Sequence, residues 1–331
     1  MKMNKTASFC VPALLNEENY AAEMSQVAEP FMASLRTDAY FAGVGGAKIH
    51  YEAYVPAEAR AAIVISHGFT ESAEKFREMT YYYLKAGYMV FAVDHRGHGY
   101  SHRENPEDPE TVHIDNFDTY IEDLKIFVDT VVKPQSKDLP LYLYGHSMGG
   151  AVSVLFIMKY ADVFEKCVLT APMISANTAN MPHFLTGTLA KIFIALGKSK
   201  EAVLGMGGYN PDRKFEDSND TSRARFDYYQ VKRNATREYQ TSRPSYAWVK
   251  EAVRIVKVQL DEANCKKIKA KVLLCQPEWD ASVIMPPQNV FVSRVPGAVF
   301  KKFYGAKHEI YMSPNDVMQK YLDTIFTFLE Q

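Results

Sequence analysis

Short apolar runs alternate with amphipathic stretches along most of this chain, as expected for the strands and helices of an α/β fold. Continuous apolar runs such as residues 61–66 and 141–144 predict strands that are covered on both faces. Apolar residues at helical spacing, as in residues 117–132, predict helices between them. We therefore expect a mostly parallel central sheet with helices on both faces. The predicted strands are residues 48–54, 61–66, 88–93, 141–144, 166–170, 271–275 and 298–303, and the predicted helices are residues 74–86, 117–132, 148–160, 183–196, 244–258 and 314–329.

This alternation stops at residue 173 and resumes near residue 263. The residues between contain helical stretches, a Gly-rich patch and a charged segment, but no apolar run that would form a buried strand. The simplest interpretation is one α/β domain, built from residues 37–172 and 263–331, with an inserted helical cap at residues 173–262. We call this insertion the cap segment.

The N-terminal extension, residues 1–36, precedes the first predicted strand. Asn16 is suited to cap a helix that begins in the sequence after it. Pro30 lies inside that helical pattern, and we expect it to break or kink the helix because proline lacks a backbone N–H.

Composition limits the cellular compartment and the binding partners that we expect. The net charge is −1, so neither a nucleic-acid partner nor an anionic membrane surface is indicated. The four cysteines, Cys10, Cys167, Cys265 and Cys275, form no metal-binding spacing, and we expect buried free thiols at Cys167 and Cys275. No apolar run is long enough for a membrane span or a signal-peptide core. We expect a cytoplasmic enzyme with at most transient contact with a membrane surface.

A nucleophile motif follows the strand at residues 141–144. The sequence Gly145-His146-Ser147-Met148-Gly149 leads directly into a helical stretch, and G-x-S-x-G between a strand and a helix is typical of a nucleophile elbow. The turn is tight, so small residues are needed on both sides of the serine. We therefore predict Ser147 as the nucleophile, with the N–H of Met148 directed to a developing oxyanion. The alternative is a chance occurrence of G-x-S-x-G, which the flanking strand and helix disfavour.

The loop after the strand at residues 61–66 is expected to provide the second oxyanion donor. It reads Ser66-His67-Gly68-Phe69, and in this architecture an N–H of that loop completes the oxyanion hole. Phe69 N–H is the candidate donor, and the alternative is an ordinary strand-to-helix loop. His67 is expected to brace the turn and not to take part in catalysis.

A serine nucleophile needs a general base and an orienting carboxylate, which follow it in the chain order Ser, acid, His. Downstream of Ser147 only His183 and His308 are available, and His183 lies in the cap segment. His308 follows the last predicted strand and is our candidate base. Asp280 follows the strand at residues 271–275 and is our candidate acid, with Glu278 as the fallback.

A second glycine-containing loop, Asp94-His95-Arg96-Gly97-His98-Gly99, contains residues that could bind a metal or a phosphate. No further ligand cluster accompanies it, and its spacing matches neither a dinucleotide-binding motif nor a P-loop. We expect a structural loop packed beneath the elbow, in which Asp94 and Arg96 tie backbone groups together.

Five motifs in this order resemble the lysophospholipase and monoacylglycerol lipase branch of the α/β-hydrolases, which is close to the serine-aminopeptidase-like hydrolases. They are HGFTES, DHRGHGYS, GHSMGG, D-x-x-V at Asp280–Val283, and GAKHEI. The likeness extends from about residue 37 to the C-terminus, and SRPSYAWVKEA resembles the part of such caps that returns to the core. It implies a triad of Ser147, Asp280 and His308, with oxyanion donors at Phe69 and Met148.

The resemblance implies an ester hydrolase that forms an acyl-enzyme on Ser147 and needs no cofactor and no metal. The expected substrate is a small-molecule ester of one acyl chain: a lysophospholipid, a monoacylglycerol or a simple carboxylester. In the cap segment, Phe184, Leu185 and Phe193 belong to an apolar helical face that either lines an acyl-chain pocket or packs on the core. The sequence leaves the head group, the acyl length and the oligomeric state open.

Three other functions remain as alternatives. An aminopeptidase or an acyltransferase could use the same scaffold, but a peptidase would need an acidic cap, and this cap segment carries 14 Lys/Arg and 10 Asp/Glu. A ligand-binding protein without catalytic activity is disfavoured by the intact Ser, Asp and His. Dehalogenases and epoxide hydrolases resemble this fold but have an aspartate at the elbow, where this chain has Ser147.

Overall fold

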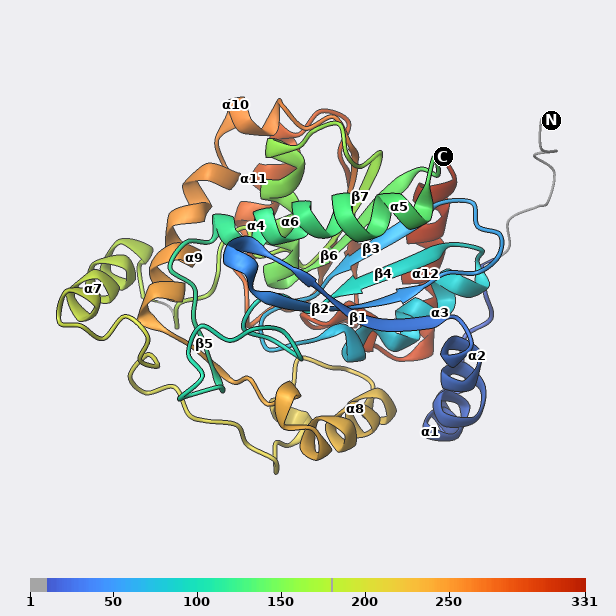
Figure 1. Cartoon of the computed structure of the whole chain (residues 1–331), viewed down its shortest axis with the longest axis horizontal. Helices are drawn as coiled ribbons and strands as arrows, with labels where there is room; N and C mark the ends of the chain where they lie inside the picture. The colour runs from blue at the N-terminus through green and yellow to red at the C-terminus, as the bar shows by residue number, and fades with distance from the viewer. Residues whose placement is uncertain (1–10, 180) are drawn as a thin grey trace.

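The computed structural model, which describes residues 11–179 and 181–331, contains a central eight-stranded sheet. The strand order is β1-β2-β4-β3-β6-β7-β9-β10 (Figure 1). β2 pairs antiparallel with both β1 and β4, and every other neighbouring pair is parallel. The strands are β1 (Arg36–Ala42), β2 (Lys48–Tyr54), β3 (Ala62–Ser66), β4 (Met89–Val93), β6 (Leu141–His146), β7 (Lys166–Thr170), β9 (Lys271–Pro277) and β10 (Val299–Phe303). This arrangement confirms the predicted mostly parallel sheet.

Alternate residues of the central strands enter two separate apolar cores, one on each face of the sheet. Val64 and Leu143 pack with α4 and α6 on one face, whereas Ile63 and Tyr142 pack with α3 and α12 on the other. Because both faces are covered, the strands are continuous apolar runs, as the sequence indicated. The helices are α1 (Tyr20–Glu23), α2 (Glu29–Ala33), α3 (Arg77–Lys85), α4 (Asp118–Phe127), α5 (Lys133–Ser136), α6 (Ser147–Lys159), α7 (His183–Ala195), α8 (Arg223–Ala235), α9 (Tyr246–Gln259), α10 (Glu262–Cys265), α11 (Met285–Arg294) and α12 (Asn315–Glu330).

The residues between β7 and β9 contain α7 to α10 and add no strand to the central sheet in the described part of the chain. A short strand in this region, β8 (Arg243–Pro244), instead pairs with β5 (Thr111–Val112), which lies in the loop after β4. α8 was not predicted, because it lies in the charged stretch of the cap segment; Ser222 caps its N-terminus by accepting a hydrogen bond from Arg225 N. None of the helices in the described residues is long and apolar enough to cross a membrane.

The N-terminal residues that the structure describes pack closely against the core and against α8 (Figure 1). Of the two predicted effects of Pro30, a break or a kink, the structure contradicts the break. The helix continues to Ala33, because a π-helical turn at Met24–Ala28 precedes the proline and puts it in the first turn of α2. The irregular turn lies just before Pro30, which has no N–H to donate to the preceding turn.

A buried ion pair joins α8 to the core beneath this N-terminal segment. The side chain of Arg225 is fully buried and donates two hydrogen bonds to Glu78 of α3, from Nε at 2.8 Å and from Nη2 at 2.7 Å. Tyr20 and Tyr82 also donate their hydroxyl groups to the Glu78 carboxylate, at 2.8 and 2.7 Å. The N-terminal segment, α3 and α8 therefore share one buried polar cluster.

We expect Arg225→Met to lower the free energy of unfolding by about 3–5 kcal/mol, because it leaves the Glu78 carboxylate buried without its cation. Urea-induced unfolding followed by circular dichroism measures the change. Arg223→Met is the matched control on the same helix, since Arg223 pairs only with the exposed Asp227. If both variants unfolded at the wild-type urea concentration, the Arg225–Glu78 pair would not stabilise the protein as argued.

Candidate active site

The predicted nucleophile elbow is present at the junction of β6 and α6. Ser147 has a φ of 50°, which is the left-handed region that a non-glycine residue rarely adopts. Gly145 and Gly149 permit this turn by close contact: a Cβ on Gly145 would lie 2.3 Å from Ser153 Oγ, and one on Gly149 would lie 2.1 Å from Ser66 O. The backbone strain is typical of residues that a fold holds in place for function.

The structure brings Ser147, His308 and Asp280 into one hydrogen-bonded chain. His308 Nε2 lies 2.9 Å from Ser147 Oγ, and His308 Nδ1 lies 2.7 Å from Asp280 Oδ2. The other oxygen of Asp280 accepts hydrogen bonds from the N–H groups of Ser282 and Val283, both at 2.9 Å. The loop after β9 carries Asp280 and the loop after β10 carries His308. Both loops reach Ser147 at the carboxyl edge of the sheet.

Electrostatics favour the charged form of the histidine. Burial by itself lowers the pKa of His308, but the charge of Asp280 and its hydrogen bond outweigh this effect, so the pKa of His308 is raised above its ordinary value. The imidazolium that forms when a base takes a proton is therefore stabilised by Asp280.

Glu278, the fallback acid, lies away from this chain of hydrogen bonds. Its carboxylate accepts a hydrogen bond from Gly305 N at 2.8 Å and is directed to an exposed turn. The structure therefore brings Asp280, and not Glu278, to His308.

The loop after β3 approaches the serine closely. A Cβ on Gly68 would lie 3.0 Å from Ser147 Cβ, and Thr70 in the same loop has a strained φ of 61°. Phe69 lines the cavity beside Ser147, and Met148 is in the first turn of α6, where backbone N–H groups have no intrahelical acceptor.

His67 braces this loop, as expected. His95 N donates to His67 Nε2 at 2.9 Å, so the ring proton is on Nδ1, which donates to Gly68 O at 2.8 Å. Burial lowers the pKa of His67 and keeps the ring neutral.

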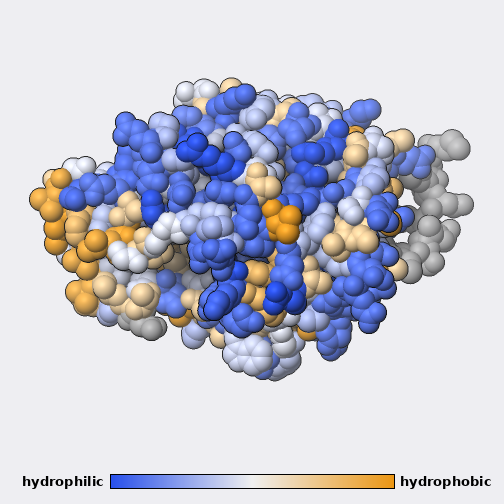
Figure 2. Space-filling view, turned by 90° about the horizontal axis from the view of Figure 1, so that it is seen from below, coloured by the Kyte–Doolittle hydropathy of each residue, from blue (hydrophilic) through white to orange (hydrophobic). Residues whose placement is uncertain are grey.

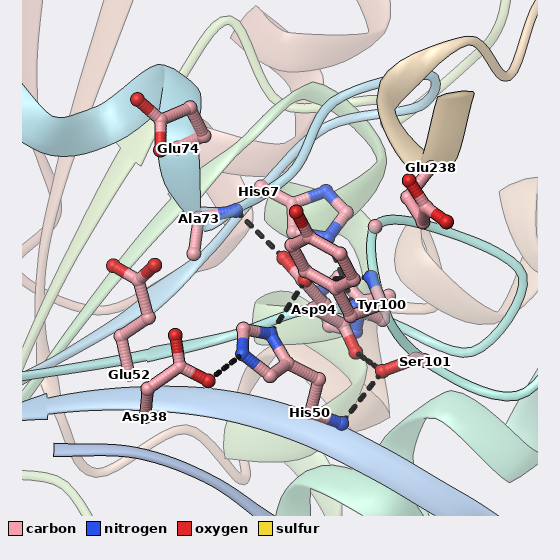
Figure 3. Close-up of polar contacts among 12 residues, drawn as sticks. Asp38, His50, Glu52, His67, Ala73, Glu74, Asp94, Tyr100, Ser101 and Glu238 are labelled. Carbon is pink, nitrogen blue, oxygen red and sulfur yellow. Dashed lines mark hydrogen bonds and ion pairs between the residues drawn. The ribbon is translucent and has the colours of Figure 1, made fainter. Parts of the chain in front are cut away.

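The polar contacts of the loop that begins at Asp94 are drawn in Figure 3. Asp94 accepts hydrogen bonds from the backbone N–H groups of Ala73 and Tyr100, at 2.7 and 3.0 Å, and contacts His50 Nδ1 at 2.7 Å. Arg96 donates to Asp123 and to the carbonyl oxygen of Val44. The predicted structural role of this loop is confirmed by these bonds. Within the described ranges, no group of three or more His, Cys, Asp and Glu side chains is arranged to hold a metal ion.

A cavity of about 460 Å³ opens at Ser147 and His308. Part of its wall is apolar and includes Phe69, Met173 and Trp248. Besides Met173 and Trp248, the cap segment contributes Tyr209, Arg213 and Arg233 to the lining.

Sequence reasoning missed a polar cluster in this cavity. Glu71 Oε2 lies 2.9 Å from His146 Nδ1, and Tyr311 donates to Glu71 Oε1 at 2.6 Å. Lys75 bridges Glu71, at 3.4 Å, and Glu309, at 2.5 Å. Burial raises the pKa of Glu71, but His146 and Lys75 outweigh it and hold that pKa well below its usual range. The only sequence signal was position, since these residues flank the motifs that carry Ser147 and His308.

The predicted substrate contacts on α7 are not at this cavity. Phe184 and Leu185 are 70% and 43% exposed, and Phe193 stacks on Tyr246 with ring centroids 4.3 Å apart. The helix packs on α9 through this ring pair and through small residues such as Gly187, which faces Val253. Both predicted arrangements, pocket lining and packing of the bulky face on the core, are therefore wrong for Phe184 and Leu185, which lie on the outer face of α7. Apolar residues gather at that end of the molecule in Figure 2.

The three cysteines that the structure describes, Cys167, Cys265 and Cys275, are buried free thiols. Burial raises the pKa of the Cys167 and Cys275 thiols, so neither is disposed to act as a nucleophile. Cys10 lies outside the described residues.

The family model described as serine aminopeptidase, S33, matches residues 57–315. The chain is 31% identical to a monoacylglycerol lipase of Mycolicibacterium smegmatis over 152 residues, which cover 46% of this chain and 52% of the relative. It is 34% identical to lysophospholipase L2 of Escherichia coli over 150 residues, which cover 45% of this chain and 43% of that protein. The chain thus spans about half the length of these two curated relatives.

A longer alignment is to a probable lysophospholipase L2 of Haemophilus influenzae, 25% identical over 303 residues, with coverage of 91% of this chain and 94% of the relative. Among solved structures, a carboxyl esterase from Bacillus coagulans has a TM-score of 0.73 at 20% identity and covers 89% of this chain and 98% of its own. A soluble variant of monoglyceride lipase from Saccharomyces cerevisiae has a TM-score of 0.71 at 18% identity, with 89% and 94% coverage. These likenesses establish the α/β-hydrolase fold.

Proposed function

This chain belongs to the serine aminopeptidase S33 family of α/β-hydrolases, and on that premise we propose that it hydrolyses carboxylic esters of single acyl chains. The observation that carries the proposal is the chain of hydrogen bonds from Asp280 through His308 to Ser147, inside a cavity. Relatives named monoacylglycerol lipase and lysophospholipase L2 support an ester as the substrate.

The geometry supports a two-step mechanism. His308 Nε2 takes the proton of Ser147 as Oγ attacks the ester carbonyl, and the N–H groups of Phe69 and Met148 stabilise the oxyanion. The protonated His308 then gives that proton to the leaving alcohol as the bond to it breaks, which leaves an acyl group on Ser147. A water molecule, deprotonated by His308, then attacks the acyl group; the bond to Ser147 Oγ breaks, His308 returns the proton to Oγ, and the acid leaves. Throughout the reaction, Asp280 keeps a ring proton of His308 on Nδ1.

The walls of the cavity favour an ester with one apolar and one polar part. Phe69, Met173 and Trp248 offer apolar surface to an acyl chain, whereas Glu71 and Lys75 offer charged groups to an alcohol part that carries hydroxyls. A peptidase would need a carboxylate free to bind an amino terminus. Glu71 and Glu309 are both paired with Lys75, so the site favours an ester over an amino-terminal peptide.

We expect kcat/KM to rise by about two- to fourfold per methylene from p-nitrophenyl acetate to medium-chain esters, since each buried CH₂ contributes about 0.8 kcal/mol. The rise should level off or reverse when the cavity is full. The panel is p-nitrophenyl acetate, butyrate, octanoate and palmitate, beside an amino-acid p-nitroanilide. A best rate on the anilide, or a steep preference for acetate, would remove the single-chain ester assignment while leaving the triad intact.

A further inference from the structure

Two arginines of the cap segment line the same cavity as Ser147. Arg213 lies in the loop before α8, and Arg233 lies in the last turn of α8. Both arginines lie close to Tyr209. The guanidinium of Arg233 is 4.9 Å from the centroid of the Tyr209 ring. Burial raises the pKa of Tyr209, and the charges of Arg233 and Arg213 act against this rise. The two guanidinium groups therefore approach one part of the cavity.

Arg233 is a buried cation without a carboxylate partner. Its side chain donates to the carbonyl oxygens of Tyr239 and Thr241, at 3.0 and 2.7 Å, and forms no ion pair with any residue that the structure describes. The other two buried arginines of the described chain differ in this respect, since Arg96 pairs with Asp123 and Arg225 pairs with Glu78. A buried charge is costly unless an opposite charge compensates it.

Arg213 likewise forms no ion pair within the described part of the chain. Its Nη2 donates to the carbonyl oxygen of Asp217 at 3.1 Å. Asp220 is buried close to Glu309, and these two effects raise the pKa of Asp220 well above its usual range; within the described residues it forms no ion pair with Arg213.

The carboxylates that face the cavity form no ion pair with these arginines in the described part of the chain. Glu71 and Glu309 share Lys75, which lies within 3.4 Å of both. The lining of the cavity thus has three cations, Lys75, Arg213 and Arg233, against two carboxylates, and an anionic group beside Ser147 would compensate the surplus positive charge.

We propose that Arg213 and Arg233 form a subsite for the phosphate of a substrate head group, so that the preferred ester is a lysophospholipid and not a neutral monoacylglycerol. The proposal rests on the ester-hydrolase function proposed above. Two guanidinium groups suit a phosphate diester, because each presents a planar fork of N–H donors to the phosphate oxygens. A single acyl chain would occupy the apolar wall, with its ester at Ser147 and its phosphate between the arginines.

The test compares two substrates with the same acyl chain, decanoyl lysophosphatidylcholine and 1-decanoylglycerol. Arg213→Gln should lower kcat/KM for the lysophospholipid by about tenfold to hundredfold, the usual loss for a hydrogen bond to a charged group, and should leave the monoacylglycerol almost unchanged. Arg233→Lys keeps the charge but removes the fork, and should show the same selective loss. Arg223→Gln is the matched control, since Arg223 lies on α8 outside the cavity and pairs with Asp227. Equal losses on both substrates, or no loss with Arg213→Gln, would overturn the proposal.

A second arm separates a lipid head group from free phosphate. Glycerophosphocholine should inhibit hydrolysis of p-nitrophenyl butyrate competitively, and more weakly in Arg213→Gln. Inhibition by inorganic phosphate alone would assign the subsite to free phosphate and overturn the lysophospholipid assignment. If the wild type hydrolysed no ester, the proposed function would fail, and calorimetric titration with glycerophosphocholine would still decide the subsite: binding that Arg213→Gln weakens supports it, and no binding overturns it.

Discussion

Replacing Ser147 by alanine is expected to lower kcat for ester hydrolysis by on the order of 10⁶, as removal of the nucleophile does in serine proteases. The hydroxyl is the only group at the end of the hydrogen-bonded chain from Asp280 that can form an ester with the acyl group. The fold should persist, since alanine fits wherever serine does. Initial rates with p-nitrophenyl butyrate measure the loss, and circular dichroism checks the fold.

Ser153→Ala is the matched control for this experiment. Ser153 lies on the same helix and is also buried, but its hydroxyl donates to Gly149 O at 2.7 Å and does not line the cavity. It should retain most of the activity. Residual activity of Ser147→Ala within tenfold of the wild type would contradict the assignment of the nucleophile.

Asp280→Asn is expected to lower kcat by about 10⁴, the loss seen when the triad carboxylate of a serine protease becomes an amide. The local hydrogen bonds give the reason. One Asp280 oxygen accepts from Ser282 N and Val283 N, so an asparagine must place its amide oxygen there and turn its NH₂ group to His308. That NH₂ group would donate to Nδ1, leave the ring proton on Nε2 and prevent the ring from accepting the proton of Ser147.

The pH profile adds an independent readout for Asp280→Asn. Activity requires neutral His308 and therefore rises with pH through the pKa of this residue. Asp280 holds that pKa above its ordinary value, so the midpoint of the residual activity should move to lower pH in Asp280→Asn. Glu278→Gln is the control, because a glutamine can still accept the hydrogen bond of Gly305 N. A larger loss in Glu278→Gln than in Asp280→Asn would contradict the choice of acid.

The core of the site could be predicted because the fold constrains it. Parallel strands all end at one edge of the sheet, so the residues that follow β6, β9 and β10 meet there although they are far apart in the chain. Ser147, Asp280 and His308 each occupy such a position. The central strands could also be predicted, since strands buried on both faces leave continuous apolar runs in the sequence.

The remaining features depend on contacts that no local pattern encodes. The pairing of Lys75 with Glu309 joins residues 234 positions apart, and the burial of Arg225 against Glu78 joins residues 147 positions apart. Edge strand β1 was missed; most of its residues are not buried, and its first three, Arg36, Thr37 and Asp38, are polar.

The orientation of α7 could not be predicted for the same reason. Its periodicity identified an apolar face, but not which face would contact α9. The contact uses small residues such as Gly187 and Ala190, because they let the two helices approach closely, and this turns Phe184 and Leu185 outward.

The most direct test of the central claim is covalent labelling with a fluorophosphonate, which reacts with activated serines. Mass spectrometry of the digested protein should find one adduct, on the peptide that contains Ser147, and labelling should disappear in Ser147→Ala and fall sharply in His308→Ala. Labelling at another serine, or undiminished labelling of Ser147→Ala, would contradict the assignment of Ser147 as the nucleophile of this hydrolase.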